Sequence, residues 1–364
     1  MKEATYGLVN TPWPAQLNKL IWSPPDHKKF DVIFSIGQVV PHEVMGMANF
    51  NKNLFIGVGG VEAINLSHFI GAVHGMEKMM GQAENPLRSI LNYASEHFLQ
   101  DVLPLWYILT VMGTDENTGE LEMKGFYIGN DIQCYLLACD LSLKVNFTML
   151  ETPLTKVVVY LNPDEFHSTW LGNKAIYRTR MAIADQGHLV VLAPGVSRFG
   201  EDDEVDTLIR KYGYKGTPYT MQKMRENKEL QENLGTVAHL IHGSTEDRFN
   251  VTYCPGHLSR KEIEGVGYNY AALNEIGQKY NIQNLKDGWN TLSNGEVIYY
   301  ISNPALGLWA VRSRFDNLSS DVSARQSSNC NTTKESCSSF QSVDISRTQN
   351  ATDHSGGVGG WKKV

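Results

Sequence analysis

The sequence predicts an α/β protein with two α/β domains, mostly parallel sheets and a cleft between the domains. Short apolar runs alternate with helical patterns along most of the chain, and this alternation is typical of parallel strands covered by helices. The length of 364 residues exceeds that of an average domain, so we expect two domains, at 1–153 and 154–315. The composition then changes, and 316–364 is a separate tail.

The first domain begins with an irregular, proline-rich lead-in over 1–29, followed by a buried strand at 31–37. A second apolar run at 54–58 leads into a glycine turn, Gly57-Val58-Gly59-Gly60, and residues 61–80 have a helical pattern. The other expected elements are helices at 86–99 and 132–145 and strands at 105–112 and 125–128.

The second domain opens with a strand at 156–161, a helix at 164–185 and a strand at 188–193. This order is one βαβ unit, which normally has a right-handed crossover. Further expected elements are helices at 203–212, 218–234 and 262–280, a strand or short helix at 237–242, and a strand at 297–301.

The tail at 316–364 is rich in Ser, Asn and Thr and has few apolar residues. Such a segment cannot bury enough apolar surface to offset the entropy lost on ordering. We therefore expect a disordered tail.

The composition excludes several classes of partner. The formal net charge of -7 gives no basic surface for nucleic acid. The longest apolar stretch, at 102–112, contains Pro104 and is too short to span a bilayer, so no membrane partner is expected. The N-terminus does not resemble a signal peptide, and five cysteines are too sparse to require disulfides. We expect a cytoplasmic protein.

One group of candidate site residues lies around the glycine turn. His42 and Glu43 follow a predicted strand, where open α/β sheets build binding crevices, and Lys52 and His68 follow. The glycine turn opens a helix, so its backbone N–H groups are available to a phosphate. A neutral imidazole binds nickel or zinc and also suits acid/base catalysis. Core or capping histidines and a surface lysine remain the alternative interpretation.

Cations in the second domain form another candidate group. Lys174, Arg178 and Arg180 lie close together in a predicted helix between two strands, where they can hold a substrate carboxylate. A solvated basic face explains the same residues equally well.

A third group contains His239, His242, Cys254 and His257. Their residue types permit a zinc site, and a zinc hydrolase is one alternative function. However, their spacing matches no strong zinc pattern, which favours a structural or substrate-shaping role.

Taken together, these segments resemble the nickel-pincer lactate racemase family from about Asp31 to Trp309. The motifs that carry the resemblance are Gly37-Gln-Val-Val-Pro-His42-Glu43, Lys52, Gly57-Val-Gly-Gly60 and Ser67-His68. Stretches at 171–182, 238–244 and 301–309 look like the branch that is described as D-mannonate epimerase.

The resemblance implies an isomerase that inverts C2 of a 2-hydroxy acid, either lactate-like or a sugar acid such as D-mannonate. The implied cofactor is the nickel-pincer nucleotide, pyridinium-3,5-bisthiocarboxylic acid mononucleotide with nickel. His68 corresponds to the nickel ligand, Lys52 to the covalent tether, and Gly57, Gly59 and Gly60 to the phosphate seat. His42 matches an acid/base histidine and Lys174 a substrate-binding lysine. The implied partners are the hydroxy-acid substrate and the enzymes that make the cofactor.

The sequence also departs from the family pattern. A glycine pair typically precedes the tethering lysine, but here the run is Met47-Ala-Asn-Phe-Asn-Lys52, and Leu171 replaces a substrate-binding glutamine. The family has further sequence upstream of the part that corresponds to Met1, including a second acid/base histidine. Without it, we expect exposed sheet edge and apolar surface. An inactive, truncated fragment that still binds cofactor is therefore an alternative.

Overall fold

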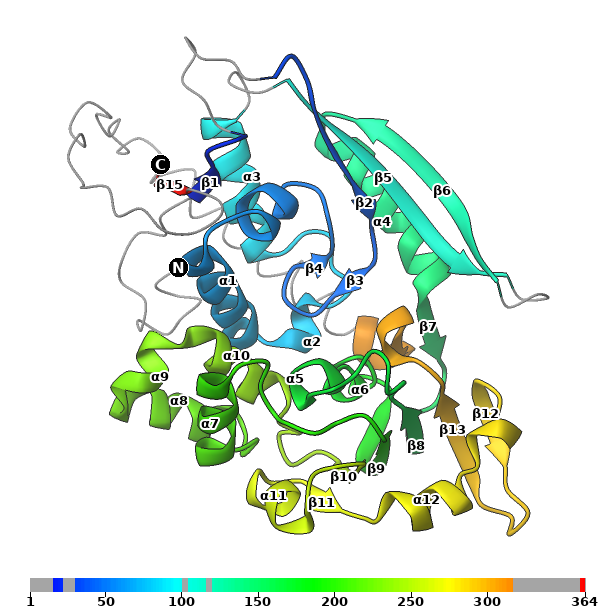
Figure 1. The fold of residues 1–364 in the computed structure, drawn as a ribbon. Coiled ribbons are helices and arrows are strands. Elements are labelled where there is room, and N and C mark those ends of the chain that lie inside the picture. The colour runs from blue at the N-terminus through cyan, green and yellow to red at the C-terminus, as the bar shows by residue number, and fades with distance from the viewer. Residues whose placement is uncertain (1–15, 22–29, 100–103, 116–119, 317–360, 364) are drawn as a thin grey trace.

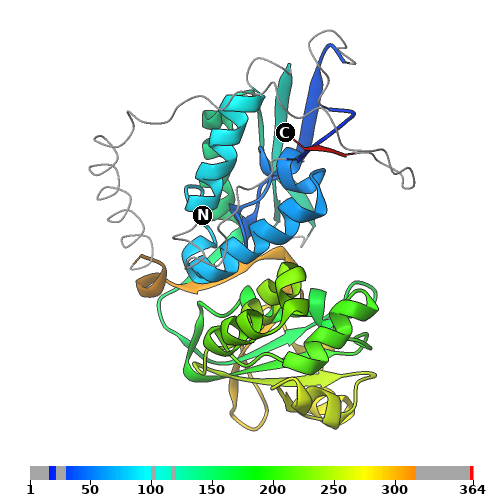
Figure 2. The ribbon, with the colours of Figure 1, turned by 90° about the vertical axis from the view of Figure 1, so that its left-hand side faces the viewer.

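The structure is a computed structural model that describes residues 16–21, 30–99, 104–115, 120–316 and 361–363. The lead-in and the tail lie almost entirely outside the described residues. In Figure 2 the first part of the chain, blue to cyan, lies above the second part, green to yellow. We keep the predicted division at residue 153 to name these two parts, because the larger sheet begins at Leu154.

The first part is built on a three-stranded sheet in the order β2-β5-β6, with β2 at Ile33–Gln38, β5 at Leu105–Thr114 and β6 at Leu121–Gly129. β2 and β5 are parallel, and β6 runs antiparallel to β5. Helix α4 (Ile132–Asn146) packs on one face of this sheet. On the strands, the apolar side chains of Phe34, Ile36, Phe126 and Ile128 are exposed.

Small elements join the strands of this first sheet. They are β3 (Pro41–His42), β4 (Gly46–Met47), the π-helix η2 (Asn53–Gly57), α1 (Val61–His74), α2 (Met76–Met79) and α3 (Pro86–Phe98). The apolar run at 54–58 is thus helical. The helix expected at 61–80 is interrupted at Gly75, where a φ of 107° is incompatible with an α-helix.

The second part contains a six-stranded sheet in the order β11-β10-β9-β8-β13-β12. Its strands are β8 (Leu154–Tyr160), β9 (Ile183–Ala193), β10 (Asn250–Pro255), β11 (Asn269–Tyr270), β12 (Gly288–Thr291) and β13 (Val297–Ile301). Every neighbouring pair is parallel except β12 and β13. The predicted α/β class with mostly parallel sheets is confirmed.

Two small sheets complete the topology. β14 (Leu308–Val311) returns from the second part and pairs in parallel with β7 (Phe147–Leu150), which precedes β8. β1 (Gln16–Asn18) pairs antiparallel with β15 (Trp361–Lys363).

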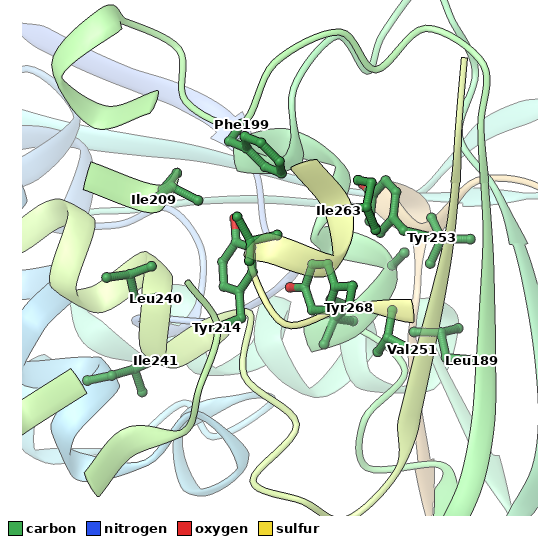
Figure 3. Packing of buried hydrophobic residues seen from close by; sticks show 14 of the residues in the cluster. Leu189, Phe199, Ile209, Tyr214, Leu240, Ile241, Val251, Tyr253, Ile263 and Tyr268 are labelled. Carbon is green, nitrogen blue, oxygen red and sulfur yellow. The ribbon is translucent and has the colours of Figure 1, made fainter. Parts of the chain in front are cut away.

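Both faces of the six-stranded sheet are buried, which explains why its strands are almost continuously apolar. The helices of this part are α7 (Asp203–Tyr212), α8 (Thr217–Glu226), α9 (Lys228–Glu232), α10 (Leu234–His242), α11 (Arg260–Gly265) and α12 (Leu273–Lys279). Leu189 and Val251 share a core with residues of α7 and α10 (Figure 3), whereas Val190 and Leu192 face the opposite way, toward α12.

Three predicted helices of the second part are wrong as single elements. The segment at 164–185 contains α5 (Thr169–Gly172), which begins at the Ser168 cap, α6 (Lys174–Tyr177) and the start of β9. The segment at 218–234 breaks at Asn227, where extended backbone separates α8 from α9. The segment at 262–280 is divided into α11, β11 and α12, since Gly267 adopts a φ of 97°. The ambiguous segment at 237–242 is helical, as the end of α10.

Candidate functional site

The structure brings His42 and Lys52 together. The β3–β4 hairpin holds the His42 ring, since the N–H groups of Val44 and Met45 donate to its Nδ1 at 3.1 and 3.3 Å. On the other side of the ring, Nε2 lies 3.1 Å from the Nζ atom of Lys52. Both side chains are partly accessible to solvent, so a ligand can reach them.

These hydrogen bonds determine the protonation states of the pair. A neutral imidazole that accepts at Nδ1 carries its proton on Nε2, so Nε2–H donates to Lys52, whose amine must be unprotonated. Burial lowers the pKa of Lys52, and Arg88 and Arg178 lower it further. Burial, followed by the charge of Lys52, also holds the pKa of His42 well below its usual value. The His42–Lys52 contact fits the neutral amine of Lys52, which is the nucleophilic form of lysine.

His68, on α1, presents its ring in the form that binds metals. Its Nδ1 lies 2.7 Å from the carbonyl oxygen of Ile64, so Nδ1–H donates there and Nε2 keeps its lone pair. None of the described residues forms a hydrogen bond with Nε2. Burial lowers the pKa of His68, which keeps the ring neutral near pH 7. The charges of Glu43 and Lys52 act on the His68 ring, so His68 lies in the same region of the fold as His42 and Lys52.

Arg178 joins this cluster from the second part of the chain. Its Nη1 donates to the carbonyl oxygen of Pro41 at 2.5 Å, and its Nη2 forms an ion pair with Glu43 at 3.2 Å. Burial raises the pKa of Glu43, but the charges of His42 and Arg178 outweigh burial and hold that pKa well below its usual range. Because the ion pair is poorly aligned, Glu43 Oε2 has no hydrogen bond although it is buried.

Lys174 lies one helical turn before Arg178, and therefore on the same side of the short α6 helix. Its side chain is half-buried and forms no hydrogen bond or ion pair with the described residues. The structure thus places Lys174 near the cluster by its position on α6 alone, and its substrate-binding role stays a prediction.

A cavity of about 300 Å³ lies between the two parts, in agreement with the expected cleft. Its walls include Ala72 and Glu77 from the first part and Arg180, Ile241 and Arg248 from the second. Of the predicted site residues, Arg180 lines this cavity, whereas His42, Lys52, His68 and Lys174 do not.

The glycines of the turn have different surroundings. A Cβ atom on Gly59 would lie 1.9 Å from the carbonyl oxygen of Phe55, so the tight turn requires glycine there. At Gly60 the corresponding space is filled by the side chain of Gln16, which donates to Glu62. Gly57 is exposed, and a Cβ atom there would have no neighbouring atom nearer than 3.8 Å. A phosphate seat at this turn stays a prediction, and Gly57 has the space for it.

The zinc site considered as an alternative is wrong. His239 Nε2 bonds to the hydroxyl of Tyr214 at 2.9 Å and its ring stacks on Trp170, whereas His257 is exposed. Cys254 is buried on the other face of the sheet. Within the described ranges, no three His, Cys, Asp or Glu side chains are grouped so that they can hold a metal ion.

Arg88 is a residue of this region that sequence reasoning missed. It is 1% exposed and bonds to the carbonyl oxygens of Asn49 and Met47, to Asn51 Oδ1 and to the hydroxyl of Tyr135. These bonds hold the loop that leads into Lys52. No local pattern in the sequence marks an arginine in an otherwise ordinary helix as buried.

The chain is similar to solved structures, although no protein-family model and no curated protein matches its sequence. A protein from Thermotoga maritima superimposes with a TM-score of 0.69 and 22% identity, over 85% of this chain and 73% of that protein. The lactate racemase apoprotein from Thermoanaerobacterium thermosaccharolyticum gives a TM-score of 0.57 and 14% identity, over 81% of this chain and 68% of the racemase.

The chain has a lactate racemase-like fold. At these identities the likeness concerns the fold, and the resemblance to a D-mannonate epimerase branch stays a prediction. No helix in the described part combines the length and the apolar character that crossing a membrane requires.

Proposed function

We propose that this protein is a racemase or epimerase that inverts C2 of a 2-hydroxy acid with a nickel-pincer nucleotide. The observation that carries the proposal is the cluster of His42, Lys52 and His68, in which His42 Nε2 lies 3.1 Å from Lys52 Nζ. The lactate racemase-like fold supports it. Lactate and sugar acids such as D-mannonate are the proposed substrates, and the enzymes that synthesise the cofactor are the proposed partners.

The side chains fit the proposed cofactor chemically. A neutral Lys52 amine is the form that joins a thiocarboxyl group, and His68 Nε2 has the free lone pair that Ni(II) accepts. Gly57 leaves room beside the backbone for a phosphate. When bound, the nickel-pincer nucleotide supplies an acceptor for the hydride of C2.

The protein's own residues bind the hydroxyl group and the carboxylate. The backbone N–H groups of the β3–β4 hairpin occupy His42 Nδ1, so Nε2–H is the group that donates a hydrogen bond to the substrate hydroxyl oxygen. Removal of the hydroxyl proton by Nε2 requires the other tautomer, with the ring proton on Nδ1, and therefore release of these two backbone bonds. Arg178 fixes the hairpin through Pro41 and Glu43. Lys174, one turn away, supplies positive charge for the substrate carboxylate.

The first test is whether the protein carries a covalent group on Lys52, which adds to its intact mass. We expect the wild-type protein, expressed together with the cofactor-making enzymes, to carry a covalent mass increment that is absent from Lys52→Ala. Intact-mass spectrometry measures it. Lys156→Ala is the matched control, because Lys156 pairs with Glu296 on the distant sheet and should keep the increment. If the wild-type protein has the mass expected from its sequence alone, the proposal is wrong.

Optical rotation then separates the enzyme from the alternative of an inactive cofactor-binding fragment. An active racemase or epimerase changes the optical rotation of lactate or of D-mannonate. A fragment carries the mass increment on Lys52 and leaves the optical rotation of both acids unchanged.

A further inference from the structure

His242 is a buried histidine whose ring has an unsatisfied nitrogen. It is the last residue of α10 and is 5% exposed, yet its Nε2 atom has no hydrogen-bond partner among the described residues. Buried polar atoms without partners are rare and costly, so each one calls for a physical explanation.

The surroundings of His242 place it beside the candidate site. α10 packs along α1, the helix that carries His68. Both Glu43 and His68 act electrostatically on the His242 ring. The guanidinium of Arg180 donates to the backbone carbonyl of His242 at 3.5 Å, and the Tyr177 ring lies 6.1 Å away, so the histidine is held in place at this boundary.

His239 provides an internal comparison. It lies one turn earlier on the same helix and is also 5% exposed. In contrast to His242, its Nε2 bonds to Tyr214 and its ring stacks on Trp170. Contacts within the protein therefore satisfy the ring of His239, whereas Nε2 of His242 has no such contact.

We propose that His242 binds the substrate from the second part of the chain, with Nε2 forming a hydrogen bond to a hydroxyl oxygen of the 2-hydroxy acid. This inference rests on the proposed function. It gives the site two imidazoles from the two parts of the chain, His42 from the β3–β4 hairpin and His242 from α10. The substrate then satisfies the polar atom that the protein leaves without a partner.

The test compares stability and affinity in two matched variants, His242→Phe and His239→Phe. Removal of an unsatisfied polar group should leave the fold intact, so we expect His242→Phe to have an unchanged or higher Tm. The same variant should bind L-lactate or D-mannonate about tenfold more weakly, from the loss of one hydrogen bond. His239→Phe should lower the Tm and keep the wild-type affinity. Calorimetry measures Tm, and isothermal titration of both acids into the full chain measures affinity.

His242→Gln adds a conservative variant, since an amide restores part of the affinity if hydrogen bonding is the role of the ring. The inference is overturned if His242→Phe binds both acids as tightly as the wild type does, whatever its Tm. If the wild-type protein binds neither acid, the proposed function itself fails, which the wild-type titration shows before any variant is compared.

Discussion

A single hydrogen bond at His68 decides which ring nitrogen is available to a metal. The Ile64 carbonyl accepts from Nδ1, and Nε2 is left with a free lone pair. His68→Ala should therefore abolish nickel binding while the fold is retained, because the ring contributes little to the core. Nickel per chain, measured by plasma mass spectrometry after expression with the cofactor-making enzymes, checks this prediction.

His97→Ala is a suitable control for His68→Ala, since His97 is near the end of another helix, where it stacks on Tyr93. This control should keep its nickel. Unchanged metal occupancy in His68→Ala would show that the ligand assignment is wrong.

The backbone before Lys52 explains how the chain manages without a glycine pair there. Asn49 and Phe50 both have a positive φ, 69° and 61°, a conformation that glycine adopts without strain. Such residues cost about 1–3 kcal/mol each unless their surroundings compensate. Phe50 stacks on Tyr135 and packs against Tyr107, and Asn49 Oδ1 accepts from Asn53. Side-chain packing therefore holds the turn that glycine would form more easily.

At the scale of elements, Arg88 joins α3 and α4 to the loop that presents Lys52. Its guanidinium bonds to Met47, Asn49 and Asn51 in the loop, and it lies 4.5 Å from the ring centre of Tyr135 on α4. Loss of this side chain leaves several buried acceptors without partners at once.

Arg88→Leu should lower the free energy of unfolding by about 3–5 kcal/mol, since each buried acceptor left unpaired carries a desolvation penalty. Urea unfolding measures the change. The control Arg225→Leu, on the exposed side of α8, should stay within about 0.5 kcal/mol of the wild type. Equal stability of the two variants would contradict the role of Arg88.

At the scale of the whole molecule, Glu77 links the two parts of the chain. Its Oε1 accepts from Arg180 Nε at 2.8 Å and from Arg248 Nη2 at 3.2 Å, across the boundary seen in Figure 1. Burial raises the pKa of Glu77, but both arginines outweigh burial and lower it below the usual value. The carboxylate therefore stabilises the folded chain at neutral pH.

Glu77→Gln should reduce the free energy of unfolding at pH 7 by about 1–3 kcal/mol. Because the folded pKa is depressed, the stabilisation is present above the unfolded pKa of about 4.3 and is lost as the pH falls through the folded pKa. The difference between wild type and variant should thus shrink in acid. Urea unfolding at several pH values from about 7 to about 3 measures it.

The exposed ion pair of Arg260 and Glu264 provides the comparison for Glu77. Glu264→Gln should change the stability by less than about 1 kcal/mol at any pH, because such pairs are screened by solvent. A constant difference between wild type and Glu77→Gln over the whole pH range would show that the link acts through packing alone.

Local sequence patterns predict the α/β class and most of the long elements. The apolar strands β8 and β9 and the helices α4 and α7 depend on the spacing of apolar residues and on local caps such as Asp131 and Asp202. These are short-range properties, so they can be predicted from neighbouring residues.

The assembly of the candidate site depends on contacts between distant segments of the chain. His42 and Lys52 are ten residues apart, but Arg178 reaches Pro41 from 137 positions away, and His242 comes from still farther along the chain. The burial of Arg88 and the unsatisfied nitrogen of His242 depend on such distant partners. Local patterns carry no information about them, because packing between distant segments sets which polar atoms meet and which are left alone.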